Sequence, residues 1–168
     1  SVSAEAKYSA GVRLSIAEDG GIYVEHVVRG QWRTSDRRRV MVQTAQLDRA
    51  TMGEVVTWIE QEPGSSGLDS VQDEIRLLMG YSVFADRPSG DKDTRLRPLS
   101  GQAQIGNLYL VQGEWNEAFI AELCAIPNGR YRDQADAASG AFNRLLEIIE
   151  AIPAAMIVHE EAVSISPI

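Results

Sequence analysis

The sequence lacks the residues on which several classes of protein depend. Its 168 residues contain one cysteine, Cys124, so an internal disulfide is excluded and a reducing cytoplasm is the favoured setting. No apolar run approaches the roughly 20 residues of a membrane-spanning helix, and residues 1–10 have neither the basic start nor the apolar stretch of a signal peptide. The length and these absences predict a single domain without a membrane segment.

The motifs of several common enzymes are missing as well. His26 and His159 are isolated, so no zinc-ligand spacing is present. Residues 89–92 lack the Gly-Lys-Ser/Thr core of an ATP-binding loop, and the sequence contains neither a Gly-x-Ser-x-Gly elbow nor a cysteine–histidine arrangement. These absences exclude an ATPase motor and the common serine and cysteine hydrolases.

The net charge of −8 counts against a protein that simply coats nucleic acid, because such proteins carry a basic excess. The basic residues are nevertheless clustered. The clusters are five arginines between residues 29 and 39; Arg87, Lys92, Arg95 and Arg97; and Arg130 with Arg132. Each cluster fits either a solvated surface or a strip that grips phosphates, and the sequence leaves both interpretations open.

Hydrophobic periodicity predicts an α/β domain. Alternating apolar residues on both sides of the Glu-Asp-Gly-Gly turn at residues 18–21 indicate a β-hairpin. Further strands are expected at residues 54–60, 81–86 and 107–111, and helices at about 34–50, 68–79, 91–105, 115–123 and 133–149. The strand at 54–60 is apolar almost throughout, which favours a central position in the sheet.

A hairpin followed by strands that alternate with helices predicts a mixed sheet with helices on both faces. This order is typical of a ribonuclease-H-like fold whose first strand is missing from the chain. We expect this domain to span residues 1–150, and residues 151–168 to form a tail that contains at most a short strand at 156–158.

Three carboxylates stand where a strand end and a helix start can present them to one cleft. Glu60 ends the apolar strand, and Asp133 and Asp136 lie three residues apart at the start of the last helix. Carboxylate oxygens are the ligands that Mg²⁺ and Mn²⁺ prefer, and two such ions can hydrolyse a phosphodiester bond. Singly, each acid also has a structural explanation: a helix cap for Asp133, a helix-dipole partner for Asp136 and a solvated strand end for Glu60.

Four sequence blocks resemble the large terminase subunit of tailed phages. They are Trp-Ile-Glu-Gln-Glu-Pro-Gly-Ser-Ser-Gly at 58–67, Arg-Pro-Ser-Gly-Asp-Lys-Asp-Thr-Arg at 87–95, Gly-Asn-Leu-Tyr-Leu-Val with Gly-Glu-Trp-Asn-Glu-Ala-Phe at 106–119, and Pro-Asn-Gly-Arg-Tyr-Arg-Asp-Gln-Ala-Asp and its continuation at 127–142. Their order matches the nuclease domain of that family, and the resemblance extends over roughly residues 8 to 145. The Gly-Ser-Ser-Gly segment at 64–67 could hold a phosphate, although a plain turn is the more common use of such a sequence.

The resemblance implies a ribonuclease-H-like endonuclease that uses two Mg²⁺ or Mn²⁺ ions to cut concatemeric double-stranded DNA during packaging. It assigns Glu60 and Asp133 as metal ligands, with Asp136 as an auxiliary ligand. It also implies partners: an upstream ATPase domain of the same polypeptide, the small terminase subunit and the portal, in the cytoplasm of a bacterial host.

Two departures from the family pattern matter. Arg132 stands where the family often has an aspartate, and the aspartate of the family's first strand has no counterpart here. We therefore expect the chain to be a fragment with weak nuclease activity. We expect DNA contacts from Arg87, Lys92, Arg95, Arg130 and Arg132. The alternatives are a non-catalytic module of the same fold that docks DNA or the portal, and another ribonuclease-H-like enzyme such as a junction resolvase or an integrase.

Overall fold

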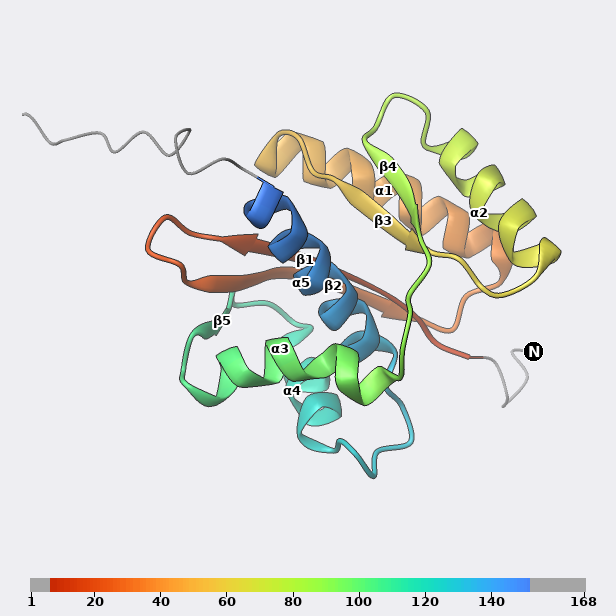
Figure 1. Ribbon diagram of the computed structural model, residues 1–168. Helices are drawn as coiled ribbons and strands as arrows, with labels where there is room; N and C mark the ends of the chain where they lie inside the picture. The colour runs from red at the N-terminus through yellow and green to blue at the C-terminus, as the bar shows by residue number, and fades with distance from the viewer. Residues whose placement is uncertain (1–6, 152–168) are drawn as a thin grey trace, which may run out of the picture.

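The computed structural model describes residues 7–151, and in this range it contains five strands and five helices (Figure 1). The strands are β1 (Ser9–Ile16), β2 (Ile22–Gly30), β3 (Thr57–Glu60), β4 (Val83–Asp86) and β5 (Leu108–Leu110). The helices are α1 (Thr34–Met52), α2 (Ser65–Leu77), α3 (Lys92–Gln104), α4 (Asn116–Cys124) and α5 (Asp133–Ala151). The tail predicted for residues 151–168 lies outside the described residues, apart from Ala151.

The first sheet is built on the predicted hairpin. β1 and β2 pair antiparallel, and the turn between them is closed by the Asp19 carboxylate, which accepts a hydrogen bond of 2.9 Å from the Gly21 N–H group. Gly20 takes a φ of 85° in this turn, a conformation that costs glycine little. β5 adds to the other edge of β2 in parallel, so this three-stranded sheet is mixed, in the order β1-β2-β5.

The second sheet contains only β3 and β4, which pair in parallel. In their register Glu60 is the partner of Asp86, so both strands end in a carboxylate at the same edge. The sequence predicted a central position for β3. This prediction is wrong for the described residues, because β3 pairs with β4 alone and its other edge meets no strand in residues 7–151.

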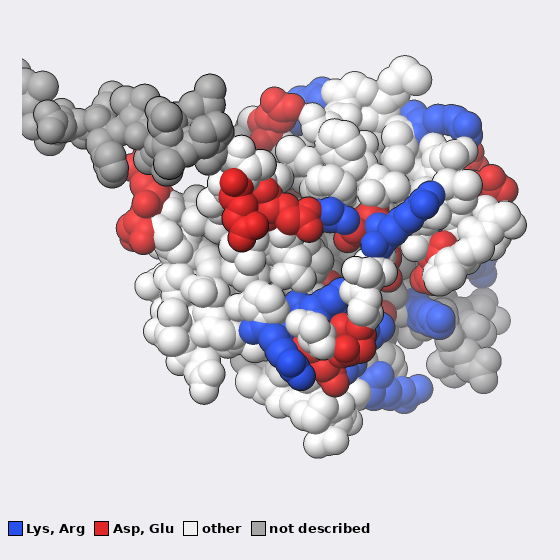
Figure 2. Space-filling model, in the orientation of Figure 1, with Lys and Arg blue, Asp and Glu red and all other residues white. Residues whose placement is uncertain are grey.

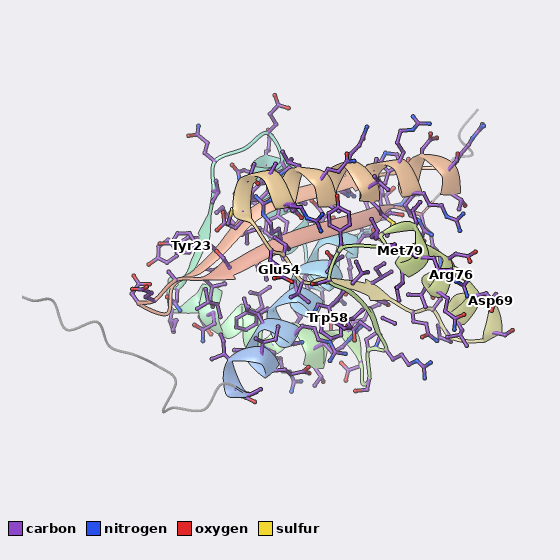
Figure 3. The ribbon with its side chains drawn as sticks, turned by 90° about the horizontal axis from the view of Figure 1, so that it is seen from above. Tyr23, Glu54, Trp58, Asp69, Arg76 and Met79 are labelled. Atoms are coloured by element: carbon purple, nitrogen blue, oxygen red, sulfur yellow. The ribbon has the colours of Figure 1, made fainter. Side chains whose placement is uncertain are left out.

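The main core lies between the first sheet and the helices α3, α4 and α5. Its buried residues come from β2 and from those three helices: Ile22, Val24, Val27, Leu96, Leu99, Phe119, Ala135, Ala138 and Phe142. Helix α1 lies on the opposite side of the hairpin from α5 (Figure 3). The Arg13 guanidinium of β1 forms an ion pair there with the buried Asp48 of α1. Helices therefore cover both faces of a mixed sheet, as predicted.

Helix α5 also connects the two sheets. It packs along β1, and its Arg144 forms an ion pair with Asp86 of β4. The same guanidinium lies 4.5 Å from the ring centroid of Trp58 in β3, which is within range of a cation–π interaction. Within residues 7–151, none of the helices combines the length and the apolar character that crossing a membrane requires.

The first turn of α2 contains a glycine that the packing requires. Gly67 is buried, and a Cβ atom added there would lie 1.9 Å from the carbonyl oxygen of Glu62, in the connection that follows Glu60. The helical Gly101 of α3 is the opposite case, since an added Cβ atom would meet no atom within 4 Å.

We predict that Gly67→Ala lowers the free energy of unfolding by about 1–3 kcal/mol, the usual cost of overpacking. Gly101→Ala is the matched control, and it should raise that free energy by about 0.5–1 kcal/mol because alanine loses less entropy in a helix. Urea denaturation of both variants measures the difference. A Gly67→Ala variant as stable as the wild type would contradict the clash.

Candidate functional site

The edge where β3 and β4 end presents two carboxylates with different surroundings. Asp86 is mostly buried and is neutralised by Arg144. Glu60 is the more exposed of the two, and its side chain has neither an ion pair nor a hydrogen bond among the described residues. Sequence reasoning identified Glu60 and missed Asp86. The signal for Asp86 was the aspartate that closes the predicted strand at 81–86, because the carboxyl ends of parallel strands meet at one edge.

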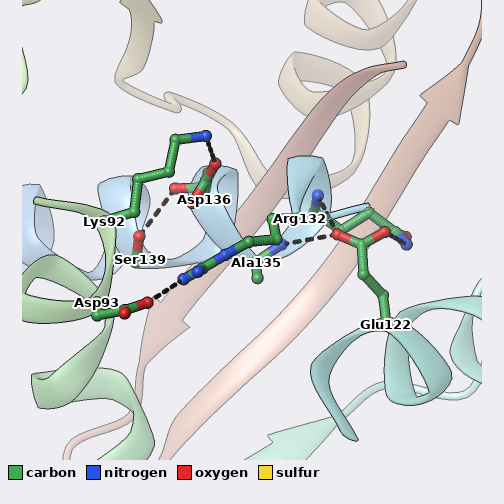
Figure 4. Close-up of polar contacts among 8 residues, drawn as sticks. Lys92, Asp93, Glu122, Arg132, Ala135, Asp136 and Ser139 are labelled. Atoms are coloured by element: carbon green, nitrogen blue, oxygen red, sulfur yellow. Dashed lines mark hydrogen bonds and ion pairs between the residues drawn. The ribbon is translucent and has the colours of Figure 1, made fainter. Parts of the chain in front are cut away.

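The other two predicted acids, Asp133 and Asp136, lie in the first turn of α5. Lys92, the first residue of α3, forms an ion pair with Asp136 (Figure 4). Asp133 forms no ion pair among the described residues, and its carboxylate accepts a hydrogen bond from its own backbone N–H group. The two acids of this helix turn therefore differ in charge balance, since one is paired with a cation and the other is not.

The pKa of the Glu60 carboxyl group is raised. Partial burial of the group is the largest cause, because it disfavours the charged form. The positive charges of Arg95 and Lys92 lower the pKa, and the negative charges of Asp136 and Glu62 raise it. The Glu60 carboxylate is therefore near both the first acid-bearing turn of α5 and the first turn of α3.

The pKa of Asp133 is raised as well, and burial is again the largest cause. Its own backbone N–H group opposes the shift, as does the charge of Arg29, whereas Glu122 and Asp136 reinforce it. Asp136 thus acts on both Glu60 and Asp133. The charge of Asp136 therefore links the pKa of the strand-end carboxylate to that of the helix-start carboxylate.

The chemistry of these side chains fits a divalent ion, because carboxylate oxygens are the preferred ligands of Mg²⁺ and Mn²⁺. Two partly desolvated carboxylates without a counter-ion, Glu60 and Asp133, are suited to attract such an ion. Across residues 7–151, however, no three histidine, cysteine, aspartate or glutamate side chains are grouped closely enough to hold a metal. The shared metal site of Glu60, Asp133 and Asp136 remains a prediction.

The five predicted DNA-binding residues have different partners. The charges of Lys92 and Arg95 lower the pKa of Glu60. The Nε of Arg95 is buried and has no hydrogen-bond partner in the described part of the chain. Arg87 donates from its Nε to Gln61, at 2.9 Å. The remaining two are Arg130, whose guanidinium lies 5.2 Å from the ring centroid of Tyr131, and Arg132, which pairs with Asp93 at 2.6 Å.

The surface on this side is not uniformly basic. Acidic and basic side chains are interleaved across the face in Figure 2, which agrees with the number of ion pairs around the start of α5. An open cavity of about 510 Å³ lies beside Glu60, between the strand ends and the first turn of α2. It is lined by residues 60–65, Leu68, Arg87 and Pro88.

The sequence offered a helix cap as the alternative role of Asp133, and the structure gives that role to another residue. Glu122 of α4 accepts hydrogen bonds from the backbone N–H groups of Gln134, at 2.7 Å, and Ala135, at 3.2 Å. Sequence reasoning missed Glu122, because a cap supplied by a different helix leaves no local pattern.

No family of proteins, curated protein or solved structure matches this chain. The likeness to the terminase family therefore depends on the four sequence blocks.

The raised pKa of Asp133 predicts how the stability of the protein varies with pH. The folded protein holds the Asp133 proton more tightly than the unfolded chain does, so this residue favours folding at acid pH, and that contribution is lost as the pH rises through the folded-state pKa. We predict that Asp133→Asn raises the Tm of the metal-free protein at pH 7, and that its advantage over the wild type shrinks as the pH falls through the folded-state pKa toward about 4, the pKa of an aspartate in the unfolded chain.

Asp69→Asn, at an exposed position of α2, is the control and should change the Tm little at either pH. Differential scanning fluorimetry across this pH range measures both variants. A Tm of Asp133→Asn below that of the wild type at pH 7 would show that the ionised carboxylate stabilises the fold.

Proposed function

We propose that this chain is the nuclease domain of a phage terminase large subunit, which hydrolyses phosphodiester bonds of concatemeric double-stranded DNA with Mg²⁺ or Mn²⁺ at Glu60, Asp133 and Asp136. The observation that carries the proposal is the pair of carboxylates without a counter-ion. Glu60 and Asp133 are partly desolvated, unpaired among the described residues, and both under the influence of Asp136.

The surrounding acids make this pair informative. Four of them have their own cation: Arg144 for Asp86, Lys92 for Asp136, Arg132 for Asp93 and Arg29 for Glu122. Glu60 and Asp133 differ from these four because no cation pairs with them among the described residues, so a cation from solution is favoured there. Perturbed carboxylates gathered at a strand end and a helix start are also typical of functional sites.

The arrangement of the strands supports a ribonuclease-H-like fold for this domain. Among the described residues, the order β1-β2-β5 leaves one edge of β1 unpaired, and the β3-β4 pair leaves one edge of β3 unpaired. Helix α5 contacts both β1 and the β3-β4 pair, so the two free edges belong to neighbouring parts of one core. We propose that they are two sides of a single sheet, which one further strand from outside residues 7–151 joins.

In this function a bound divalent ion supplies the activation of water and the stabilisation of charge on the phosphate. The side chains do the rest. Glu60 and Asp133 would hold the ion, and Asp136 would be a third ligand if its ion pair with Lys92 opened. The ammonium group of Lys92, released from Asp136, and the guanidinium group of Arg95 would then donate to phosphate oxygens of the DNA backbone.

The alternative function is a module of the same fold that docks DNA or the portal without cutting. In both functions the domain works with an ATPase domain, the small terminase subunit and the portal. Nuclease activity separates the two.

We predict that the protein nicks supercoiled plasmid DNA in the presence of Mn²⁺, and that Glu60→Ala and Asp133→Asn reduce nicking to the level seen with EDTA. Glu114→Ala, at an exposed position before α4, is the matched control and should nick like the wild type. Mn²⁺ binding without any nicking would favour the docking module. Nicking that survives both substitutions would exclude this site.

We predict that DNA binding weakens with salt and that Lys92 and Arg95 contribute to that dependence. Each phosphate contact on duplex DNA adds about 0.9 to the slope of log affinity against log salt, so Lys92→Ala and Arg95→Ala should each lower the slope by about that amount. Arg39→Ala, on the exposed surface of α1, is the control. Fluorescence anisotropy with a labelled duplex measures the slopes, and equal slopes for all four proteins would count against the contacts.

A further inference from the structure

A buried carboxylate lies next to the candidate site without belonging to it. Glu122 projects from α4, and its side chain is 5% exposed. A buried carboxylate is costly unless it is hydrogen-bonded and paired with a cation. The hydrogen bonds and the ion pair that stabilise the buried Glu122 carboxylate come from the first turn of α5 and from one arginine.

The contacts of Glu122 with α5 use both carboxylate oxygens. Oε1 accepts from the backbone N–H groups of Gln134 and Ala135, and Oε2 accepts from the side-chain amide of Gln134 at 2.7 Å (Figure 4). Helix α5 begins at Asp133, so these N–H groups are two of the four that a helix start leaves without an internal partner. A cap of this kind is normally the side chain of the residue just before the helix.

The residue just before α5 cannot serve as that cap. Arg132 has no acceptor in its side chain, and its guanidinium is directed to Asp93 of α3 at 2.6 Å. Glu122 therefore replaces the missing local cap from a different helix. Because Glu122 fills this role, the carboxylates of Asp133 and Asp136 are not needed as caps, and that of Asp136 pairs with Lys92 instead.

The cation that balances Glu122 is itself held firmly. Arg29, near the end of β2, lies 3.5 Å from a Glu122 oxygen. Its guanidinium stacks 3.6 Å from the ring centroid of Tyr8 and lies 5.3 Å from that of Tyr131. These two rings contact each other edge to face at 4.9 Å. The position of Glu122 is thus fixed by β2 and by the segment that leads into α5.

We propose that Glu122 is a positioning residue for the metal site, which holds the first turn of α5 so that Asp133 and Asp136 present their carboxylates toward the end of β3. This inference rests on the proposed function, because it assigns Glu122 a purpose in metal binding by those acids. The rigidity of the turn supports it: Gln134 is 1% exposed and Ala135 is fully buried, so the backbone between the two acids has little freedom.

The test compares Glu122→Gln and Glu122→Ala with Glu117→Gln, a control at an exposed position of the same helix. Two quantities are measured on the whole chain: amide hydrogen exchange of residues 134–136, and the Kd for Mn²⁺ by electron paramagnetic resonance. Glutamine keeps one acceptor oxygen for the two N–H groups, whereas alanine keeps none. We expect Mn²⁺ affinity to fall in that order, by about 10-fold to 100-fold, as for other residues that orient metal ligands. The control should leave both quantities unchanged.

Asp133→Asn separates the failure of this inference from the failure of the proposed function. If Asp133→Asn weakens Mn²⁺ binding while folded Glu122→Gln binds Mn²⁺ like the wild type, Glu122 is only a structural cap and the positioning role is overturned alone. If the wild type shows no Mn²⁺ binding that depends on Asp133, the proposed function and the positioning role fail together. Should Glu122→Ala not fold, Glu122→Gln carries the comparison.

Discussion

The packing of α5 across both sheets is the constraint on which the rest of the structure depends. The two sheets share no strand pairing in the described residues, so they are held together by side chains instead of by backbone hydrogen bonds. Small and aromatic residues on one side of α5, such as Ala138 and Phe142, enter the core against the hairpin. Arg144 on the same helix reaches the β3-β4 pair, where its charge meets Asp86 and its flat guanidinium covers Trp58. The start of this helix carries two of the candidate ligands, so its placement also sets the geometry of the candidate site.

Local patterns in the sequence predicted the elements well. Alternation on either side of residues 18–21 gave the hairpin, and the spacing of apolar residues gave all five helices, because these signals arise within a few residues of one another. The separation into two sheets could not be predicted from the sequence, since strand pairing joins residues that are far apart along the chain. Glu122 and the Arg144–Asp86 pair were missed for the same reason: each joins two elements, and a single residue in a helix gives no sign of its partner. Glu60, Asp133 and Asp136 were selected by motif and by position at element ends, and the structure adds their charge balance.

The ion pairs around the start of α5 also explain how a chain with a net charge of −8 can have a defined electrostatic pattern. Two ion pairs connect the first turns of α3 and α5. In one, Arg132 from the start of α5 pairs with an acid of α3, and in the other, Lys92 of α3 pairs with an acid of α5. Such pairs add little to stability where they are exposed to water. Their effect is on the distribution of charge, because they neutralise local acids, whereas Glu60 and Asp133 form no ion pair among the described residues.

The ion pair between Lys92 and Asp136 makes the two sides of this site thermodynamically linked. A cation that binds Asp136 has to displace the ammonium group, and an anion that binds the ammonium group releases Asp136. Each ligand therefore removes part of the cost of binding the other. Such a coupling free energy is reciprocal, so the factor by which an anion improves cation affinity equals the factor by which the cation improves anion affinity. One surface lysine in this position is enough to make occupancy by the two ligands cooperative without any change in the fold.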